Sequence, residues 1–334
     1  MLRLPPFRYL APRTVEQAVH MLAGEGEQAM LVAGGTDLYP NMKRRQFTPA
    51  VLIGLRGITS LKGIAGSPDQ GMRIGAGVTL ATLAEHPVIQ RYYSALATAA
   101  GAVSTPQLRN MGTMGGNLLL DTRCNYYNQT EFWRQSIGYC MKKDGDVCLV
   151  APGSPRCWAI ASADSAPVLV SLGAQVRLVS KRGERILPVR ELFRDDGMKP
   201  YTMERDELLA EILLPPADGW RSAYLKLRRR GSFDFPILGV AAALRFNEDG
   251  TIANARLTLG AVASHPVEAH EAAAQLLGKS LSRELIDTVA IAAAKRSKPL
   301  DNADLTINYR KQVTPVFVRR ALEELMKKDT VANP

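Results

Sequence analysis

Two glycine-rich turns constrain the fold of this chain more than any other feature of its sequence. The first, AGGTDL (33–38), follows an apolar strand pattern, AMLVA (29–33), and the second is GTMGGN (112–117). A glycine pair after a strand lets backbone N–H groups approach a diphosphate, because no Cβ stands in the way. Neither turn fits G-x-G-x-x-G or the Walker pattern, which excludes a plain nicotinamide Rossmann domain or P-loop at the motif level. One such turn is most often an ordinary tight turn, and only the pair indicates a diphosphate clamp.

The composition predicts a soluble chain of more than one domain. With 334 residues, of which 46% are hydrophobic, it is long enough to bury two or three cores. The N-terminal segment has basic residues without an apolar stretch, and no run reaches the roughly 18 uncharged residues of a membrane helix. The formal charge of +10 is scattered, without the interleaved aromatics or module signatures of nucleic-acid binders. We therefore expect a cytoplasmic protein that binds neither nucleic acid nor membrane.

All four cysteines lie in one stretch, which is rich in aromatic and polar residues and lacks sustained periodicity. They are Cys124, Cys140, Cys148 and Cys157, with the spacing C-x15-C-x7-C-x8-C. A cytosolic chain keeps its thiols reduced, so a metal or cluster site is favoured over two disulfides. Four thiolates suit zinc or an iron–sulfur cluster, and the spacing alone does not choose between them. We interpret this stretch as an inserted lobe.

The remaining pattern alternates short apolar runs with helical periodicity, which predicts mixed α and β structure. Paired prolines at 215–219 make the best linker candidate, because they stop both helices and strands. Before the linker, a helix is expected at 165–172 and a strand at 175–180. After it, antiparallel strands are expected at 223–229, 237–246 and 252–259, followed by helices at about 266–277, 282–294 and 314–327.

Four segments, taken in order, carry a family resemblance. AGGTDL, QLRNMGTMGGNL (107–118), SADSAP (162–167) and AYLKLRRRGSFDFP (223–236) resemble the FAD subunits of the xanthine oxidase and carbon monoxide dehydrogenase family of molybdenum hydroxylases. The match spans nearly the whole chain. It implies an α+β protein with the two-subdomain, PCMH-like FAD-binding fold of these flavoproteins and a C-terminal α+β domain of antiparallel strands and helices. The implied boundaries are 1–215 for the FAD-binding domain (subdomains about 1–57 and 58–215), 122–158 for the inserted lobe and 220–330 for the C-terminal domain.

The resemblance also implies which residues bind FAD. Residues of the first turn and the strand before it would line one side of the diphosphate, and residues of the second turn the other. Asp164 would lie at the FAD site, Leu209 against the ring system and Lys226 near the isoalloxazine, although each also has a structural explanation, as a helix N-terminal, core or surface residue. Where some relatives have an aromatic residue before the second turn, this chain has AGAV (100–103), which leaves the stacking partner of the ring open. The two turns contribute Leu31, Val32, Ala33, Gly34, Gly35, Thr36, Asp37, Thr113, Gly115, Gly116 and Asn117.

The inserted segment that carries the cysteines indicates which members of the family this chain resembles most. Most relatives pass directly from the second turn to the S-x-x-D segment, whereas this chain inserts more than thirty residues. An insert that opens DTRCNYYNQTEFWR and closes SPRCWAIASADSAP is similar to that of the β-subunits of 4-hydroxybenzoyl-CoA reductases, which carries a 4Fe-4S cluster. The resemblance implies such a cluster on Cys124, Cys140, Cys148 and Cys157. Aromatic residues would shield it from water or form the lobe's own small core: Tyr126, Tyr127, Phe132, Trp133, Tyr139 and Trp158.

A role in electron transfer follows from this resemblance. Reduced ferredoxin would donate electrons that reach a molybdenum cofactor on a large subunit through the 4Fe-4S cluster, FAD and the 2Fe-2S clusters of a small subunit, in a dimer of heterotrimers. The complex would reductively dehydroxylate 4-hydroxybenzoyl-CoA to benzoyl-CoA during anaerobic degradation of aromatic compounds. No catalytic constellation is found on the chain itself, as expected of a relay. The alternatives are a flavin and 4Fe-4S subunit of another molybdenum hydroxylase, such as an aldehyde oxidoreductase, and a zinc-stabilised, non-enzymatic binding subunit.

Overall fold

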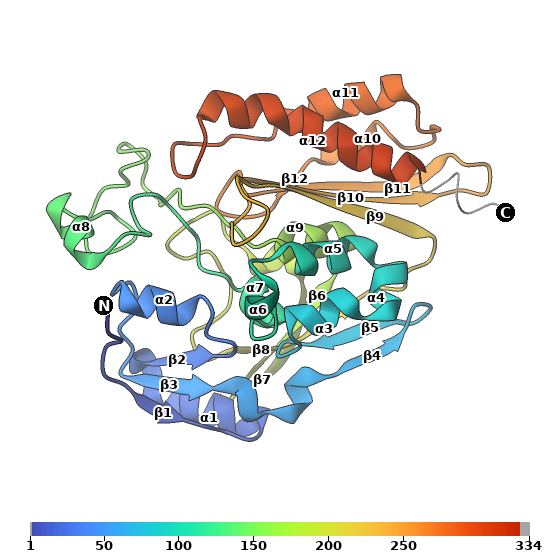
Figure 1. The fold of residues 1–334 in the computed structure, drawn as a ribbon. Coiled ribbons are helices and arrows are strands. Elements are labelled where there is room, and N and C mark those ends of the chain that lie inside the picture. Colours follow the sequence, from blue (N-terminus) through green and yellow to red (C-terminus); the bar gives the residue numbers. More distant parts are fainter. Residues whose placement is uncertain (1, 328–334) are drawn as a thin grey trace.

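The computed structural model describes residues 2–327 and contains three sheets, with a layer of helices between the second and the third (Figure 1). The first sheet is parallel, with β3 in the centre. Helix α1 (Val15–Glu25) covers it, because its apolar side chains recur at helical spacing and are buried. Thr14 caps this helix by accepting a hydrogen bond from the Gln17 amide at 3.2 Å. The strands are β1 (Arg8–Leu10), β2 (Ala29–Val32) and β3 (Val51–Gly54), and α2 (Leu38–Lys43) follows the first glycine turn.

The second sheet is antiparallel and has the order β4-β5-β8-β6-β7. A group of short helices covers one face and forms the largest core with it. Pro87 divides the alanine-rich helical run, because a proline is accepted at the first position of a helix but not in its interior. The strands are β4 (Ile64–Ser67), β5 (Gly71–Gly75), β6 (Gln175–Ser180), β7 (Gly183–Pro188) and β8 (Leu208–Leu214). The helices are α3 (Leu80–Glu85), α4 (Pro87–Tyr92), α5 (Ser94–Ala102), α6 (Pro106–Arg109), α7 (Met114–Leu118) and α9 (Ser165–Leu172).

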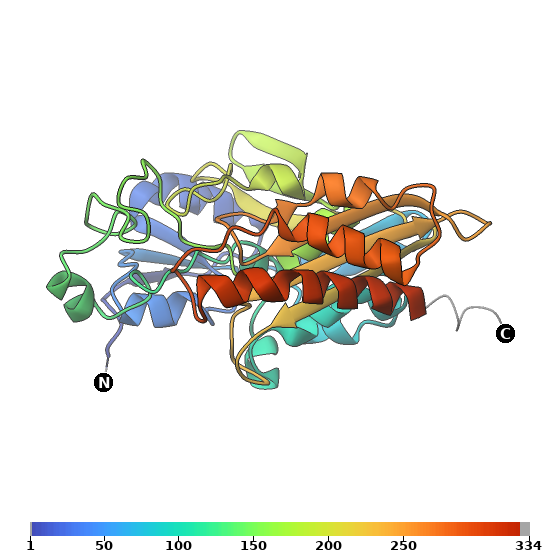
Figure 2. The same ribbon diagram turned by 90° about the horizontal axis from the view of Figure 1, so that it is seen from above.

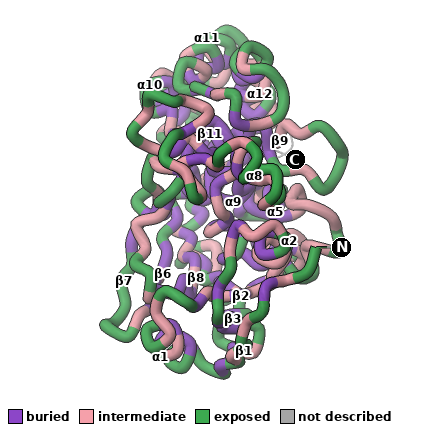
Figure 3. Tube along the Cα trace, turned by 90° about the vertical axis from the view of Figure 1, so that its left-hand side faces the viewer, coloured by how far each residue is buried: buried purple, intermediate pink, exposed green. Residues whose placement is uncertain are grey.

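The third sheet is antiparallel, with the order β12-β11-β10-β9, and lies between two helical layers. Helices α5 and α9 contact one face, and α10 to α12 cover the other, as the view from above shows (Figure 2). Both α9 and β11 carry buried residues (Figure 3); those of α9 belong to the core of the second sheet, and those of β11 to a separate core with α10 to α12. The elements are β9 (Trp220–Leu227), β10 (Leu238–Phe246), β11 (Ile252–Gly260), β12 (Val267–Glu268), α10 (His270–Ala274), α11 (Arg283–Ala294) and α12 (Ile307–Lys327).

The mixed α+β fold is as predicted, but two helices differ from the expected ranges. The segment expected to be one helix at 266–277 contains strand β12 and the short helix α10, because Val267 and Glu268 pair with β11. Helix α12 begins at Ile307, before Pro315, rather than at 314. Its first turns are held by buried Arg310, which donates hydrogen bonds to the Leu300 and Ala261 carbonyls at 2.9 and 2.7 Å. Residue 1 and residues 328–330 of the predicted domains lie outside the described residues.

The cysteine-bearing segment projects from the side of the molecule with one short helix, α8 (Glu131–Ser136) (Figures 1 and 2). We call residues 122–158, the range of the predicted insert, the cysteine lobe. Fully buried Arg134 fastens it to the end of α2, donating to the Arg44 and Arg45 carbonyl oxygens at 3.1 and 3.2 Å. None of the helices within residues 2–327 has both the length and the apolar character that a membrane span requires.

Candidate functional site

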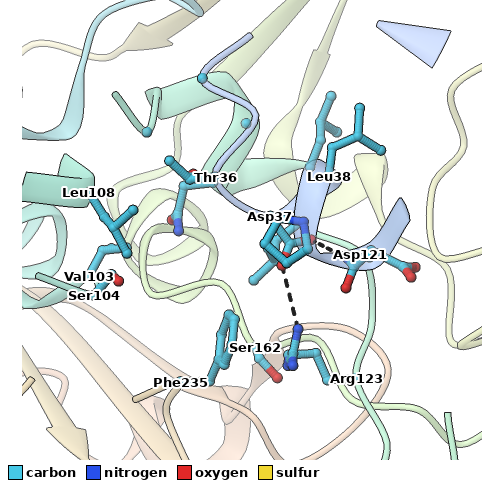
Figure 4. A pocket seen from close by; sticks show the side chains of 18 of the residues that line it. Thr36, Asp37, Leu38, Val103, Ser104, Leu108, Asp121, Arg123, Ser162 and Phe235 are labelled. Atoms are coloured by element: carbon cyan, nitrogen blue, oxygen red, sulfur yellow. Dashed lines mark hydrogen bonds and ion pairs between the residues drawn. The ribbon is translucent and has the colours of Figure 1, made fainter. Parts of the chain in front are cut away.

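A cavity of about 640 Å³ opens where the two glycine turns face each other, and residues of the C-terminal sheet domain close one side of it (Figure 4). All but one of the residues predicted to bind FAD line this cavity. The fold therefore brings together the two turns with Asp164 and Leu209, which the resemblance implied and which lie far away in the chain. The lining includes Leu31, Val32, Ala33, Gly34, Gly35, Thr36, Asp37, Thr113, Gly115, Gly116, Asn117, Asp164 and Leu209.

Both glycines of the first turn are required by the backbone geometry. Gly35 has φ +69°, a left-handed conformation that residues with a Cβ rarely adopt. A Cβ on Gly34 would lie 2.0 Å from the Met111 carbonyl oxygen, so the first turn packs directly against the chain entering the second. This close contact leaves the backbone of both turns bare toward the cavity, which suits the approach of a diphosphate.

The second turn is held by the backbone before α3. The amides of Met114 and Gly115 donate to the Val78 and Ala76 carbonyl oxygens, each at 2.8 Å. Asn117 then fastens the turn to the start of α9, because its Oδ1 accepts from the Ser165 amide at 3.2 Å and the Ser165 hydroxyl at 2.6 Å. The side chain of Asn117 is therefore used inside the protein, and the amides of Gly116 and Asn117 also donate within it, to Thr113.

Every carboxylate that lines the cavity has a cationic partner. Such pairing matters at a diphosphate site, because an uncompensated carboxylate would repel the ligand. Asp37 in the first turn pairs with Arg123, whose guanidinium lies 3.8 Å from the centre of the Phe235 ring (Figure 4). The pairs are Asp37–Arg123 (3.5 Å), Asp121–Lys142 (2.8 Å), Asp164–Lys226 (2.9 Å), Asp304–Arg229 (3.7 Å) and Asp234–Arg230.

Lys226 is the predicted FAD residue that does not line the cavity. Its Nζ lies behind Asp164 and also donates to the Ala102 carbonyl oxygen at 3.0 Å. The Tyr224 hydroxyl donates to the other oxygen of Asp164 at 2.8 Å, so both carboxylate oxygens are fixed. Burial raises the pKa of the Asp164 carboxyl group, and Lys226 opposes the rise. Lys226 thus orients a carboxylate of the cavity wall from the C-terminal domain.

Replacing Lys226 with methionine is expected to lower the free energy of unfolding by about 3 kcal/mol, because it leaves the buried Asp164 carboxylate without its counter-charge. The double variant Asp164→Asn with Lys226→Met should recover part of that loss. Urea denaturation measures both, with exposed Lys62→Met as the control. An unchanged unfolding midpoint for Lys226→Met would contradict this account of the pair.

The four cysteines converge on a second, small cavity inside the lobe. Cys124, Cys140, Cys148 and Cys157 are all buried, free of disulfides, and line this cavity. Within residues 2–327, no three His, Cys, Asp or Glu side chains are arranged as ligands of a single metal ion. Four buried thiols that line one cavity are a donor set of the kind that holds metal ions or iron–sulfur clusters.

The surroundings of these thiols disfavour free thiolates. Burial raises the pKa of Cys124 to about 12 and that of Cys157 to about 11, and the neighbouring cysteines add to the rise. A bound, positively charged metal centre would stabilise thiolates there. Buried Lys142 lines the same cavity, and the Ala159 amide donates to Cys157 Sγ at 3.4 Å. Hydrogen bonds and charges of this kind tune bound clusters.

Aromatic residues cover the cysteines only in part. Tyr127 is 2% exposed and belongs to the same buried cluster as Cys124, Cys140 and Cys157, against which partly buried Tyr126 packs. Phe132, in contrast, is 81% exposed on α8 and shields nothing, because α8 projects into solvent. Sequence reasoning also missed Arg123, Lys142 and Phe235, whose partners lie far away in the chain. The only local signal is that Arg123 directly precedes Cys124.

Comparisons with known proteins agree with this arrangement. The model for the FAD binding domain in molybdopterin dehydrogenase matches residues 5–217, and that for the CO dehydrogenase flavoprotein C-terminal domain matches residues 222–325. The aldehyde oxidoreductase FAD-binding subunit PaoB of Escherichia coli is 33% identical over 74% of this chain and 79% of its own length. The carbon monoxide dehydrogenase medium chain of Hydrogenophaga pseudoflava is 28% identical over 95% of this chain and 96% of its own.

A solved structure of carbon monoxide dehydrogenase from Hydrogenophaga pseudoflava matches the fold with a TM-score of 0.77 at 29% identity, covering 96% of this chain and 97% of that one. The similarity therefore extends over both the cavity-forming part and the C-terminal sheet. The chain belongs to the molybdenum hydroxylase family, as an FAD-binding electron-transfer subunit of an oxidoreductase complex.

Proposed function

We propose that the chain holds FAD in the large cavity and a 4Fe-4S cluster on the four cysteines, and that it relays electrons between them. The observation that carries the proposal is that Cys124 lines both cavities. The two sites therefore share a wall at Cys124, which suits electron transfer. When bound, flavin and cluster supply the redox chemistry, and the protein supplies their placement.

The chain's own residues have three tasks in this relay. The glycine turns bind the diphosphate through backbone groups, and the ion pairs around the cavity remove repulsion from its carboxylates. Tyr224 and Lys226 orient Asp164. The lobe buries the cysteines, which limits the access of water to the cluster.

For the complete enzyme, the proposed partners are a large molybdenum subunit and a small 2Fe-2S subunit in a dimer of heterotrimers, with ferredoxin as electron donor. The proposed reaction is the reductive dehydroxylation of 4-hydroxybenzoyl-CoA. The insert, which opens DTRC at 121–124 and closes SPRC at 154–157, supports this assignment. A basic chain with a formal charge of +10 also suits an acidic electron carrier.

A second candidate is a flavin and cluster subunit of an aldehyde oxidoreductase. It is favoured by the 33% identity to the aldehyde oxidoreductase FAD-binding subunit PaoB. The two candidates differ in the substrate of the assembled complex. Turnover of aromatic aldehydes, with none of 4-hydroxybenzoyl-CoA, would select the second.

The relay role predicts that the isolated chain, loaded with flavin and cluster and reduced by dithionite, leaves 4-hydroxybenzoyl-CoA unchanged. In the proposed relay, flavin and cluster carry electrons only, so turnover should need the molybdenum subunit. Product formation is measured by chromatography of the thioesters before and after that subunit is added. Formation of benzoyl-CoA by the isolated chain would show that it is an enzyme in its own right and overturn the relay.

A further inference from the structure

Asp37 is an unusual residue for a diphosphate-binding turn, because its carboxylate carries the same sign of charge as the ligand. It stands at the start of α2 but makes no capping bond to the helix backbone. Oδ2 accepts from the Asn41 side-chain amide at 2.8 Å, and Oδ1 lies 3.5 Å from Arg123 Nη1. The nearby carboxylate Asp121 is already paired with Lys142 at 2.8 Å. Arg123 makes the ion pair with Asp37, and Arg44 is a second cation near its carboxylate.

Arg123 is held in place from three directions. Its backbone pairs with that of Ile160 across the base of the cysteine lobe. The Arg123 amide donates to the Ile160 carbonyl oxygen at 2.9 Å, and the Ile160 amide donates to the Arg123 carbonyl oxygen at 2.8 Å. This closure does not depend on the cysteine side chains. The guanidinium stacks on Phe235, which lies in the loop between β9 and β10, with 3.8 Å between its Cζ and the ring centre. The cation is thus fixed between the lobe, the first turn and the C-terminal domain.

We propose that Arg123 is a positioning residue of the flavin site, supplied by the base of the inserted lobe. It neutralises Asp37, so that the first turn accepts a diphosphate, and it sets the place of the adjacent Cys124 in the shared wall. The role of Arg123 in placing Cys124 rests on the proposed relay. According to this proposal, the affinity for FAD depends on the charge balance between Asp37 in the first turn and Arg123 at the base of the lobe, as well as on the shape of the turns.

The test measures FAD affinity of the full-length chain after removal and re-addition of the flavin. Arg123→Met should weaken binding by about tenfold or more, because one charge-assisted pair is lost beside the diphosphate. Arg123→Lys should retain most of the affinity. Asp37→Asn in the Arg123→Met background should restore binding to within about threefold of the unmodified chain, since the uncompensated charge is then gone. Arg73→Met, which breaks a pair with Glu211 away from the cavity, is the matched control.

Recovery in the double variant separates charge compensation from a loss of structure, because a second substitution would not repair a misfolded lobe. Unchanged affinity in Arg123→Met, or a double variant that binds FAD no better than Arg123→Met, would overturn the proposal. Iron is counted on the same samples. An unmodified chain without iron would refute the relay, yet the comparison of FAD affinities would still decide the role of Arg123.

Discussion

Replacing Cys140 with serine is expected to remove the iron and leave the FAD in place. Cys140 lines the lobe cavity but not the flavin cavity, whereas Cys124 lines both, so Cys140 separates the two cofactors cleanly. A serine hydroxyl is a poor substitute for a thiolate, and we expect iron to fall from about four atoms per chain to below about one. Iron and flavin are measured on chains purified without oxygen.

Phe132→Ser is the matched control for this variant. It lies on the same lobe, but its side chain is exposed and touches neither cavity, so iron and flavin should both stay at the level of the unmodified chain. Equal iron in the Cys140→Ser chain and the unmodified chain would show that Cys140 is no ligand. Loss of iron and flavin together would show that the two sites do not fold independently.

Gly34→Ala is expected to abolish stable FAD binding. The new Cβ would lie 2.0 Å from the Met111 carbonyl oxygen and 2.7 Å from its carbon, both backbone atoms that no rotamer change can move. The two turns must then separate, which costs about 3 kcal/mol of overpacking and corresponds to about 100-fold in affinity. The measurement is the FAD content after purification, followed by titration of the flavin-free chain.

Gly63→Ala provides the control, because nothing lies within 4 Å of a Cβ at Gly63 and its φ of −83° is open to alanine. This variant should bind FAD as the unmodified chain does. If Gly34→Ala did the same, the close packing of the two turns would not be what forms the flavin site. Circular dichroism of both variants distinguishes a displaced turn from an unfolded chain.

Elements with strong periodicity or clear end signals could be predicted from the sequence. The expected helix at 165–172 coincides with α9, whose eight residues are all buried, and the expected strand at 175–180 coincides with β6. Strand β7 was not predicted, because it is an edge strand whose first four residues are exposed and do not alternate. Helix α12 continues past Pro315 through tertiary contacts of Arg310, which no local pattern reports.

The residues of the candidate site also fall into two groups, those with a local sequence signal and those that only the fold brings together. The glycine turns and the cysteines are local patterns that the sequence displays, and the resemblance pointed to Asp164 and Leu209, which line the cavity; their roles stay predictions. The ion pairs around the cavity join residues far apart in sequence, such as Asp37 and Arg123, and only the fold brings them together. Lys226 shows the limit of carrying over a role by position, since its side chain lies behind Asp164 and outside the cavity lining.

The central claim is that one chain holds a flavin and an iron–sulfur cluster in adjoining cavities. It is tested most directly by purifying the full-length chain without oxygen and counting iron, zinc and FAD in the same sample. We predict about four irons and one FAD per chain, with no stoichiometric zinc. Zinc in place of iron, or a chain with no flavin, would contradict the account.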